Sequence, residues 1–295
     1  MNDSSNTNSP TLCITNYEAY ERFFDIDMRY QYWLNPKLKG KEKLRLALLI
    51  AARFGFVSAI TLTWLFNIKR YKVLEFLRRQ VDTGFFDKVT TMRAADGIVF
   101  CLTYGGAKYA TEIMGIDIPF HSSANSADRL NMNSIMHDSI LQFVMLAGVN
   151  NCNADGHYKP HWKGFVSEIE FRRLYPSNTV KKVDGVVLNS DSSVASIELE
   201  NSFKRKSQTQ QTLMRLKEAI LGHHKLYDKA FFVGCSDKVF RDTQRFQAEL
   251  LEELPQRYNK KTKSILMTEQ EAQQLRERLI FRTKFTDKIN QLFYS

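Results

Sequence analysis

Two apolar segments joined by a short polar stretch constrain the fold of this chain most strongly. Residues 181–188 (KKVDGVVL) and 194–200 (VASIELE) are rich in aliphatic side chains, and residues 189–193 (NSDSS) between them favour a turn. This pattern predicts two neighbouring antiparallel strands. Because apolar residues occupy positions on both faces of each predicted strand, we expect a sheet that is covered on its two faces. An acidic side chain buried in such a sheet is costly unless a cation or a hydrogen-bond donor neutralises it.

Three acidic residues lie within these two predicted strands. Side chains alternate between the faces of a strand, so Glu198 and Glu200 share one face, and Asp184 falls opposite Glu198 if Leu188 pairs with Val194. Converging carboxylates repel each other unless a cation is present, and oxygen ligands suit a hard divalent ion. The pattern predicts a Mg²⁺ or Mn²⁺ site at these acids, a kind of site that serves phosphodiester chemistry. The alternative is an amphipathic hairpin with a polar outer face.

Composition places the chain among folded proteins and limits the class of partner. The chain has 295 residues, of which 43% are hydrophobic and 25% charged, enough for one large domain or two modest ones. A net charge of +10 suits a polyanionic partner. We find no signal peptide, no apolar run that could cross a bilayer and no paired cysteine motif, and we expect a cytoplasmic protein with a disordered tail over residues 1–15.

The order of elements in the first half is typical of a winged helix-turn-helix. Apolar spacing predicts helices and then a hairpin, in this order: helices over residues 17–33, 41–54, 58–66 and 69–81, strands over 85–91 and 98–103, and a helix over 106–114. The helix over residues 69–81, the third helix of the winged-helix unit that starts at residue 41, would enter the major groove of DNA and would present a basic face. That face consists of Arg70, Lys72, Arg78 and Arg79. A winged helix that binds protein, or that only supports the fold, is the alternative.

A stretch rich in Ser, Asn and Asp over residues 121–131 predicts a linker. It would separate a winged-helix domain over residues 16–120 from a second domain over residues 132–295. In the second domain the pattern predicts, in order, a helix over 134–147, a strand over 165–174, the two acid-bearing strands, a helix over 208–221, a strand over 230–235, and a helical extension over 237–253 and 270–279. The expected fold class is therefore α+β.

The core order of helix, three strands, helix and strand, together with the motifs VDG at residues 183–185 and IELE at residues 197–200, resembles the PD-(D/E)XK nuclease superfamily. In that superfamily an Asp starts the second core strand and an acid-x-Lys motif ends the third. Here Glu200 stands where Lys is usual, as it does in some restriction enzymes, and Val183 replaces a common Pro. The resemblance implies that Lys204 supplies the missing amine, in a catalytic set of Asp184, Glu198, Glu200 and Lys204.

A winged helix ahead of such a core resembles, over roughly residues 41–237, the MOBC relaxases of mobilisable plasmids and the related replication-relaxation proteins. The resemblance implies a metal-dependent, site- and strand-specific nickase that acts on double-stranded DNA at a transfer origin. Its partners would include accessory mobilisation and coupling proteins. Two alternatives stay open. One is a catalytically inactive DNA-binding replication initiator or regulator, which the missing Lys favours, and the other is a restriction or repair endonuclease.

Several further side chains are candidates for the same site. The accessory candidates are His137 and Asp138 in the helix before the sheet, Glu170 in the preceding predicted strand, and Gln211 in the helix after the acids. The alternative for His137 is a histidine packed in the core. The alternative for Glu170 is a place on an exposed edge strand, paired with Arg172 or Arg173. If a tyrosine holds the nicked 5′ phosphate, the candidates are Tyr158, Tyr175 and Tyr227, whereas metal-activated water needs none of them.

Overall fold

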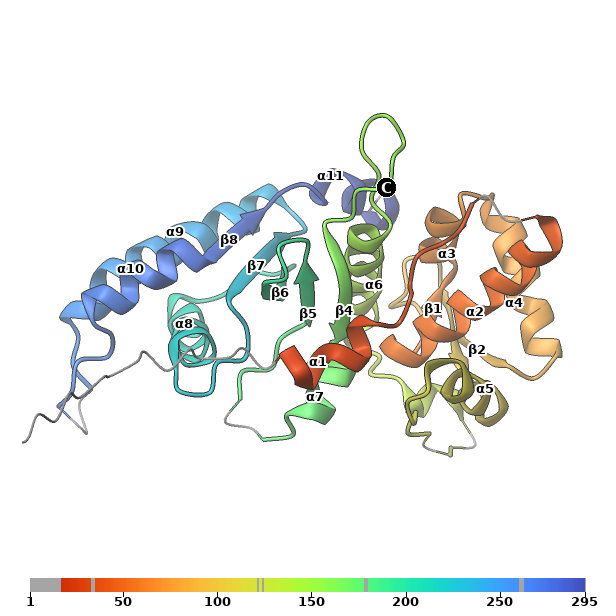
Figure 1. Ribbon diagram of the computed structural model, residues 1–295, viewed down its shortest axis with the longest axis horizontal. Helices are drawn as coiled ribbons and strands as arrows, with labels where there is room; N and C mark the ends of the chain where they lie inside the picture. The colour runs from red at the N-terminus through yellow and green to blue at the C-terminus, as the bar shows by residue number, and fades with distance from the viewer. Residues whose placement is uncertain are drawn as a thin grey trace, which may run out of the picture.

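The computed structural model describes residues 17–32, 35–120, 122–123, 125–177, 180–259 and 263–294. The expected disordered tail lies outside these residues, and so do His121 and Ala124 in the expected linker. A small sheet with its helices occupies one end of the molecule, a larger sheet lies towards the middle, and long C-terminal helices reach the other end (Figure 1). The protein is α+β, as predicted.

The N-terminal part is built on a three-stranded sheet of order β1-β3-β2. Its elements are α2 (Pro36–Phe54), β1 (Val57–Ser58), α3 (Ala59–Phe66), α4 (Arg70–Asp82), β2 (Phe86–Thr90), β3 (Ile98–Leu102) and α5 (Tyr104–Met114). The helices and the antiparallel β2–β3 hairpin follow one another in the predicted order. The sequence did not predict β1, which joins the open side of β3.

Local chemistry explains where these helices begin and end. Asn35 accepts a hydrogen bond from the first turn of α2, and Pro36 occupies a position where no intrahelical donor is needed, so α2 begins earlier than residue 41. Gly55 ends this helix with a left-handed backbone, φ +84°. Ser58 caps α3 by accepting a hydrogen bond from the amide of Thr61 at 3.2 Å.

The C-terminal part is built on a five-stranded mixed sheet of order β4-β5-β6-β7-β8. Its main elements are α6 (Ile135–Val149), β4 (Trp162–Ser167), α7 (Glu168–Leu174), β5 (Gly185–Asn189), β6 (Val194–Glu200), α8 (Lys206–Leu221), β7 (Lys229–Gly234), α9 (Asp237–Glu253), α10 (Glu269–Arg278) and β8 (Leu279–Arg282). Short helical turns follow in this part: η2 (Leu254–Gln256), α11 (Thr286–Ile289) and η3 (Asn290–Tyr294). The turn η1 (Ser126–Arg129) packs instead against β2 of the small sheet. The sequence did not predict β8, which lies parallel to β7.

The expected strand over residues 165–174 is wrong beyond Ser167, where α7 begins. The hydroxyl of Ser167 accepts a hydrogen bond from the amide of Glu170 at 3.3 Å, and the carboxylate of Glu170 accepts one from the amide of Ser167 at 2.7 Å. This reciprocal capping box starts a helix. Glu168 and Glu170 therefore lie in the first turn of α7 rather than on one face of an edge strand.

The register of the acid-bearing strands is the one predicted. Leu188 pairs with Val194, and Gly185 pairs with Ile197, in an antiparallel arrangement. Every residue of β5 and of β6 is buried, as expected for a sheet covered on both faces. Helix α6 covers one face, where Ile197 packs, whereas α8, α9 and α10 cover the other, where Val194 packs.

Helix α1 (Tyr17–Phe24) belongs with the larger sheet. The predicted helix over residues 17–33 ends at Phe24, and its buried side chains Tyr20 and Phe23 share a hydrophobic cluster with Phe171 of α7. Helix α1, which was expected to belong to the N-terminal domain, therefore packs on the C-terminal part.

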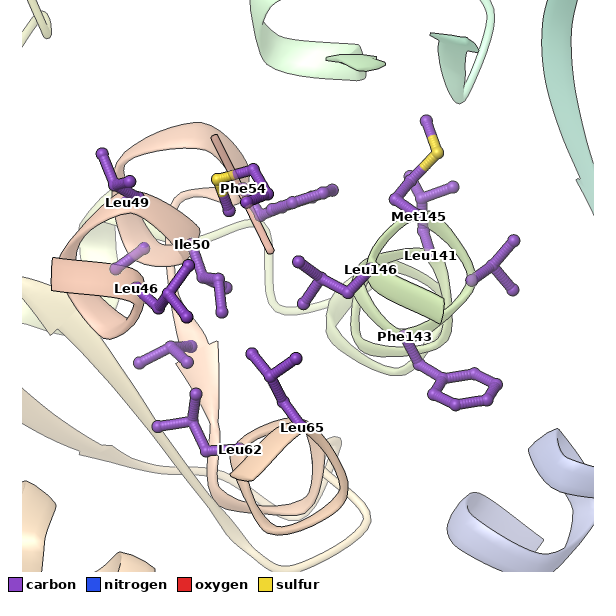
Figure 2. Close-up of a cluster of buried hydrophobic side chains, with 14 of the residues drawn as sticks. Leu46, Leu49, Ile50, Phe54, Leu62, Leu65, Leu141, Phe143, Met145 and Leu146 are labelled. Carbon is purple, nitrogen blue, oxygen red and sulfur yellow. The ribbon is translucent and has the colours of Figure 1, made fainter. Parts of the chain in front are cut away.

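One hydrophobic core runs from the small sheet to the large one. Figure 2 shows where α2, α3 and α6 meet, with Leu46 and Ile50 of α2, Leu65 of α3 and Leu146 of α6 directed into the space between the helices. The same cluster continues through α6 to Ile197 of β6. Helix α6 therefore completes the N-terminal core and also covers the larger sheet.

A fully buried ion pair ties the two parts together. Arg53 of α2 donates to both carboxylate oxygens of Glu170 in α7, at 2.8 and 3.0 Å, and also to the carbonyl oxygens of Phe165 and Phe23. Both charged side chains are out of contact with water, so each depends on the other for its stability.

Candidate active site

Asp184 reaches across from the start of β5 to β6. Its amide donates to the carbonyl of Ile197 at 3.2 Å, and its carboxylate accepts a hydrogen bond from the amide of Leu199 at 2.6 Å. These two bonds extend the β5–β6 register by one residue and place Asp184 opposite Glu198, as the sequence predicted. Glu198 and Glu200 share the face of β6 on which α8 lies.

Lysine side chains meet two of the three acids. Lys181 Nζ lies 2.8 Å from both carboxylate oxygens of Glu198, and Lys204 Nζ lies 2.7 Å from Oε1 of Glu200. The other carboxylate oxygen of Glu200, Oε2, is buried and has no hydrogen-bond partner in the described part of the chain. Lys204 was predicted to supply an amine at this position, whereas no role was predicted for Lys181.

His137 and Asp138 come to the same place from α6. His137 Nδ1 lies 3.1 Å from Oδ1 of Asp138, and Nε2 lies 3.5 Å from Oδ2 of Asp184. Ser134 holds Asp138 by donating to its Oδ2 at 2.6 Å. The expectation that this helix directs a polar side chain at the acids agrees with these contacts.

The electrostatics of the site follow from these contacts. Burial alone would lower the pKa of His137, but its hydrogen bonds to Asp138 and Asp184 raise that pKa to about 10, so the imidazole is protonated at neutral pH. Burial alone would raise the pKa of Asp184, yet the hydrogen bond and positive charge of His137 bring it below the ordinary value. Burial raises the pKa of Glu198 to about 7, although Lys181 acts in the opposite direction.

The carboxylate oxygens at this site are of the type that binds divalent ions, although neighbouring basic side chains already balance the carboxylate charges. Within the described residues, no group of three or more His, Cys, Asp or Glu side chains is arranged as a ready metal site. The oxygen donors of Asp184, Glu198 and Glu200 are those that Mg²⁺ and Mn²⁺ prefer. The buried and unpartnered Oε2 of Glu200 is an acceptor that a cation would satisfy.

The remaining accessory candidates divide between two places. Glu170 forms the buried pair with Arg53, and Glu168 forms an ion pair with Arg172 along α7. Gln211 lies instead beside the lysines, lining a cavity of about 230 Å³ that Lys181 and Lys204 also line.

The basic face of α4 has the predicted orientation. Val73 and Leu77 are buried against the N-terminal core, and the four cations point outward. Arg70 pairs with Asp96 at 3.7 Å, in the loop that joins β2 and β3, and Lys72 pairs with Glu75. Arg78 and Arg79 have no carboxylate within ion-pair distance in the described residues, so their charges are available to an anion.

The three tyrosine candidates differ in accessibility. Tyr227 is fully buried, and burial raises the pKa of its hydroxyl well above the ordinary value, so a phenolate nucleophile is disfavoured there. Tyr175 ends α7 and packs on Phe171, and Tyr158 is exposed beneath the guanidinium of Arg29.

No protein-family model, curated protein or solved structure matches this chain. Of the helices in the described residues, none combines the length and the apolar character needed to cross a bilayer.

Proposed function

We propose that this protein is a metal-dependent DNA endonuclease whose active site comprises Asp184, Glu198, Glu200 and Lys204. The observation that carries the proposal is the pairing of Asp184, directly before β5, with Glu198 in the fully buried strand β6. A sheet interior is a costly place for converging carboxylates, and binding a divalent ion is a function that compensates for that cost. Asp184, Glu198 and Glu200 would hold the ion, which would stabilise charge on the scissile phosphate and activate a water molecule.

The surrounding fold supports a nuclease of the PD-(D/E)XK type. The elements α6, β4, β5, β6, α8 and β7 follow the helix, three strands, helix, strand order, with α7 inserted after β4. The third strand is antiparallel to the second and parallel to the fourth. Lys204 Nζ, 2.7 Å from Glu200, would provide the amine that the acid-x-Lys motif normally places on the strand itself.

The N-terminal part would hold the enzyme on duplex DNA as a winged helix. Helix α4 presents the exposed cations, and the β2–β3 hairpin lies beside it, tied to it by the Arg70–Asp96 pair. In this arrangement α4 would enter the major groove, and the hairpin would contact the backbone.

The finer proposal is a plasmid-mobilisation relaxase that nicks one strand at a transfer origin. It rests on the resemblance of the whole layout, winged helix followed by nuclease core. Metal-activated water is the preferred nucleophile, because the acids dominate the site and Tyr227, the buried candidate, has a strongly disfavoured phenolate.

A specific observation favours a second function, that of an inactive DNA-binding initiator or regulator. Lys181 occupies both oxygens of Glu198, and Lys204 occupies one oxygen of Glu200, so lysines alone balance these acids. A protein that had lost catalysis would keep its fold through such pairs.

Incubation with supercoiled plasmid carrying a transfer origin separates the two functions. The endonuclease produces relaxed circles with Mg²⁺ or Mn²⁺ and none with EDTA. Asp184→Asn and Glu198→Gln abolish nicking, whereas Glu252→Gln, at an exposed acid of α9, does not. Nicking by Asp184→Asn at the wild-type rate, or DNA binding without nicking in any metal, would reject the endonuclease.

A further inference from the structure

A polar groove runs along α8, starting at the acidic site. Its inner cavity, of about 230 Å³, is lined by Lys181, Lys182, Lys204, Gln208, Gln211, Thr212 and Arg215. A second cavity of about 360 Å³ shares Gln211 and Arg215 with the first and continues to Ser207, Gln210 and Met214. The two cavities therefore lie side by side over the same two turns of α8, with the side chains of Gln211 and Arg215 between them.

The sequence of α8 builds this groove through two stripes of side chains. Thr209, Leu213, Leu216 and Ile220 are buried against the larger sheet. Gln208, Gln211, Thr212 and Arg215 follow the spacing i, i+3, i+4, i+7, which places them along one side of the helix. The whole length of this polar stripe faces the cavity, where amides and a hydroxyl offer both donors and acceptors.

The charge of the groove is positive. No acidic residue is among the described residues that line either cavity. Lys181 and Lys204 are balanced by Glu198 and Glu200 at the inner end. The other two lining cations have no carboxylate within ion-pair distance in the described part of the chain: Lys182 donates only to the carbonyl oxygens of Tyr175 and Ser177, and Arg215 is exposed.

We propose that this groove binds one polynucleotide strand along α8 and leads it to the acidic site, with Arg215 and Lys182 as phosphate-binding residues. Four cations and no acid line the inner cavity, and two of these cations have no carboxylate partner among the described residues, which suits a polyanion. Direct binding by Arg215 would be bidentate, since its guanidinium matches the geometry of a phosphate group. This inference rests on the proposed function, because it takes DNA as the polyanion and identifies the surface that holds it at the site.

Other cations on the same helix contrast with Arg215. Lys206, at the start of α8, is held by Glu249 and Glu253 of α9, at 2.9 and 2.6 Å. Lys217 pairs with Glu271 of α10 at 3.2 Å. These lysines form ion pairs with the neighbouring helices, whereas Arg215 forms none among the described residues and can bind a ligand.

The test measures binding separately from nicking. The full-length protein is titrated into a fluorescein-labelled single-stranded oligonucleotide in EDTA, over a series of salt concentrations. Arg215→Ala should weaken binding about three- to tenfold and reduce the slope of log K against log salt by about one, and Arg215→Lys should restore the slope. Arg276→Ala, which removes an exposed arginine from α10, is the matched control and should change neither quantity.

The possible outcomes distinguish this inference from the proposed function. Loss of affinity in Arg215→Ala supports the groove whether or not the wild type nicks plasmid. Wild-type affinity and wild-type salt slope in Arg215→Ala overturn it, even if nicking proves to depend on metal and on Asp184. Circular dichroism and thermal unfolding verify that Arg215→Ala folds, and its exposed position predicts an unchanged Tm.

Discussion

Lys181 Nζ lies at the same distance, 2.8 Å, from both carboxylate oxygens of Glu198. Lys181 precedes β5, and Glu198 lies near the end of β6. The pair therefore joins the two strands at the ends where the acidic residues lie. Both side chains are largely buried, and a buried pair of this kind is strongly destabilised when one partner is lost. In the proposed metal site, a bound cation would share this position with Lys181 or displace its amine.

Removing Lys181 should destabilise the metal-free protein and make its stability depend on metal. At pH 8, where Glu198 is largely ionised in the wild type, we expect Lys181→Met to lower the free energy of unfolding in EDTA by about 3 kcal/mol, because the buried carboxylate loses its partner charge or must take up a proton. Added Mn²⁺ should restore part of this loss, since an ion that binds only the folded state stabilises it. Urea denaturation measures both effects.

The matched control for this prediction is Lys206→Met. Lys206 bridges two glutamates at the surface, where water screens the charges and an ion pair adds little to stability. A Lys181→Met variant as stable as Lys206→Met, or unaffected by Mn²⁺, would show that the lysine does not stand in for a cation.

The Arg53–Glu170 pair should matter for folding and not for chemistry. Glu170→Ala leaves the buried guanidinium of Arg53 unpaired and also removes the capping box of α7, so we expect a loss of about 3–5 kcal/mol in unfolding free energy. Arg172→Ala breaks an exposed pair on the same helix and should cost about 1 kcal/mol or less. Equal effects of the two variants in urea denaturation would contradict the buried linkage of the two parts.

The pKa values of two histidines should be shifted in opposite directions from the ordinary value in the metal-free protein. We expect His137 to lose its proton near pH 10, whereas burial and the nearby charges of Lys284 and Arg282 lower the pKa of His161 to about 4. NMR titration of the imidazole signals checks both values, and His137→Gln identifies the first signal by removing it. An ordinary pKa for His137 would mean that Asp138 and Asp184 do not contact it in solution.

The sign of the stability effect differs between these histidines. The folded-state pKa of His137 is raised, so its contribution is complete below about pH 6.5 and is lost as the pH rises towards about 10. The folded-state pKa of His161 is depressed, so its contribution is complete above about pH 6.5 and is lost as the pH falls towards about 4. In urea denaturation between pH 6.5 and 10, His137→Gln should lose less stability than the wild type does.

Duplex binding should depend on the free arginines of α4. We expect Arg78→Ala and Arg79→Ala each to weaken binding to duplex DNA and to reduce the salt slope by about one, with Arg276→Ala unchanged. The full-length chain is the right material for this test. A fragment ending near Ser126 would lack α6 and would expose Leu46 and Leu65, which pack against Leu146 (Figure 2).

The parts of this fold that depend on neighbouring residues could be predicted from the sequence. The pairing of Leu188 with Val194 follows from a turn-prone stretch between two apolar segments, and it fixed the position of Asp184 opposite Glu198. The start of α7 also has a local signal, the Ser167-x-x-Glu170 capping box. It was missed because Glu168 and Glu170 alternate with apolar residues as they would in a strand.

Long-range relationships could not be predicted in the same way. Arg53 and Glu170 are far apart in the sequence, and no pattern around either residue identifies its partner. The packing of α1 against the larger sheet and the core that α6 shares with α2 arise from tertiary contacts that cross the expected linker. No role was predicted for Lys181, because only the register of β5 and β6 brings it to Glu198.

Calorimetric titration with Mn²⁺ shows most directly whether Asp184, Glu198 and Glu200 form a divalent-ion site. The wild-type protein should bind Mn²⁺ with saturation, and Asp184→Asn and Glu198→Gln should each lose at least about tenfold in affinity, because each removes a charged oxygen ligand. Glu252→Gln, at an exposed position of α9, should bind as the wild type does. Equal Mn²⁺ binding by wild type and Asp184→Asn, or no binding by the wild type, would mean that these carboxylates do not form a divalent-ion site.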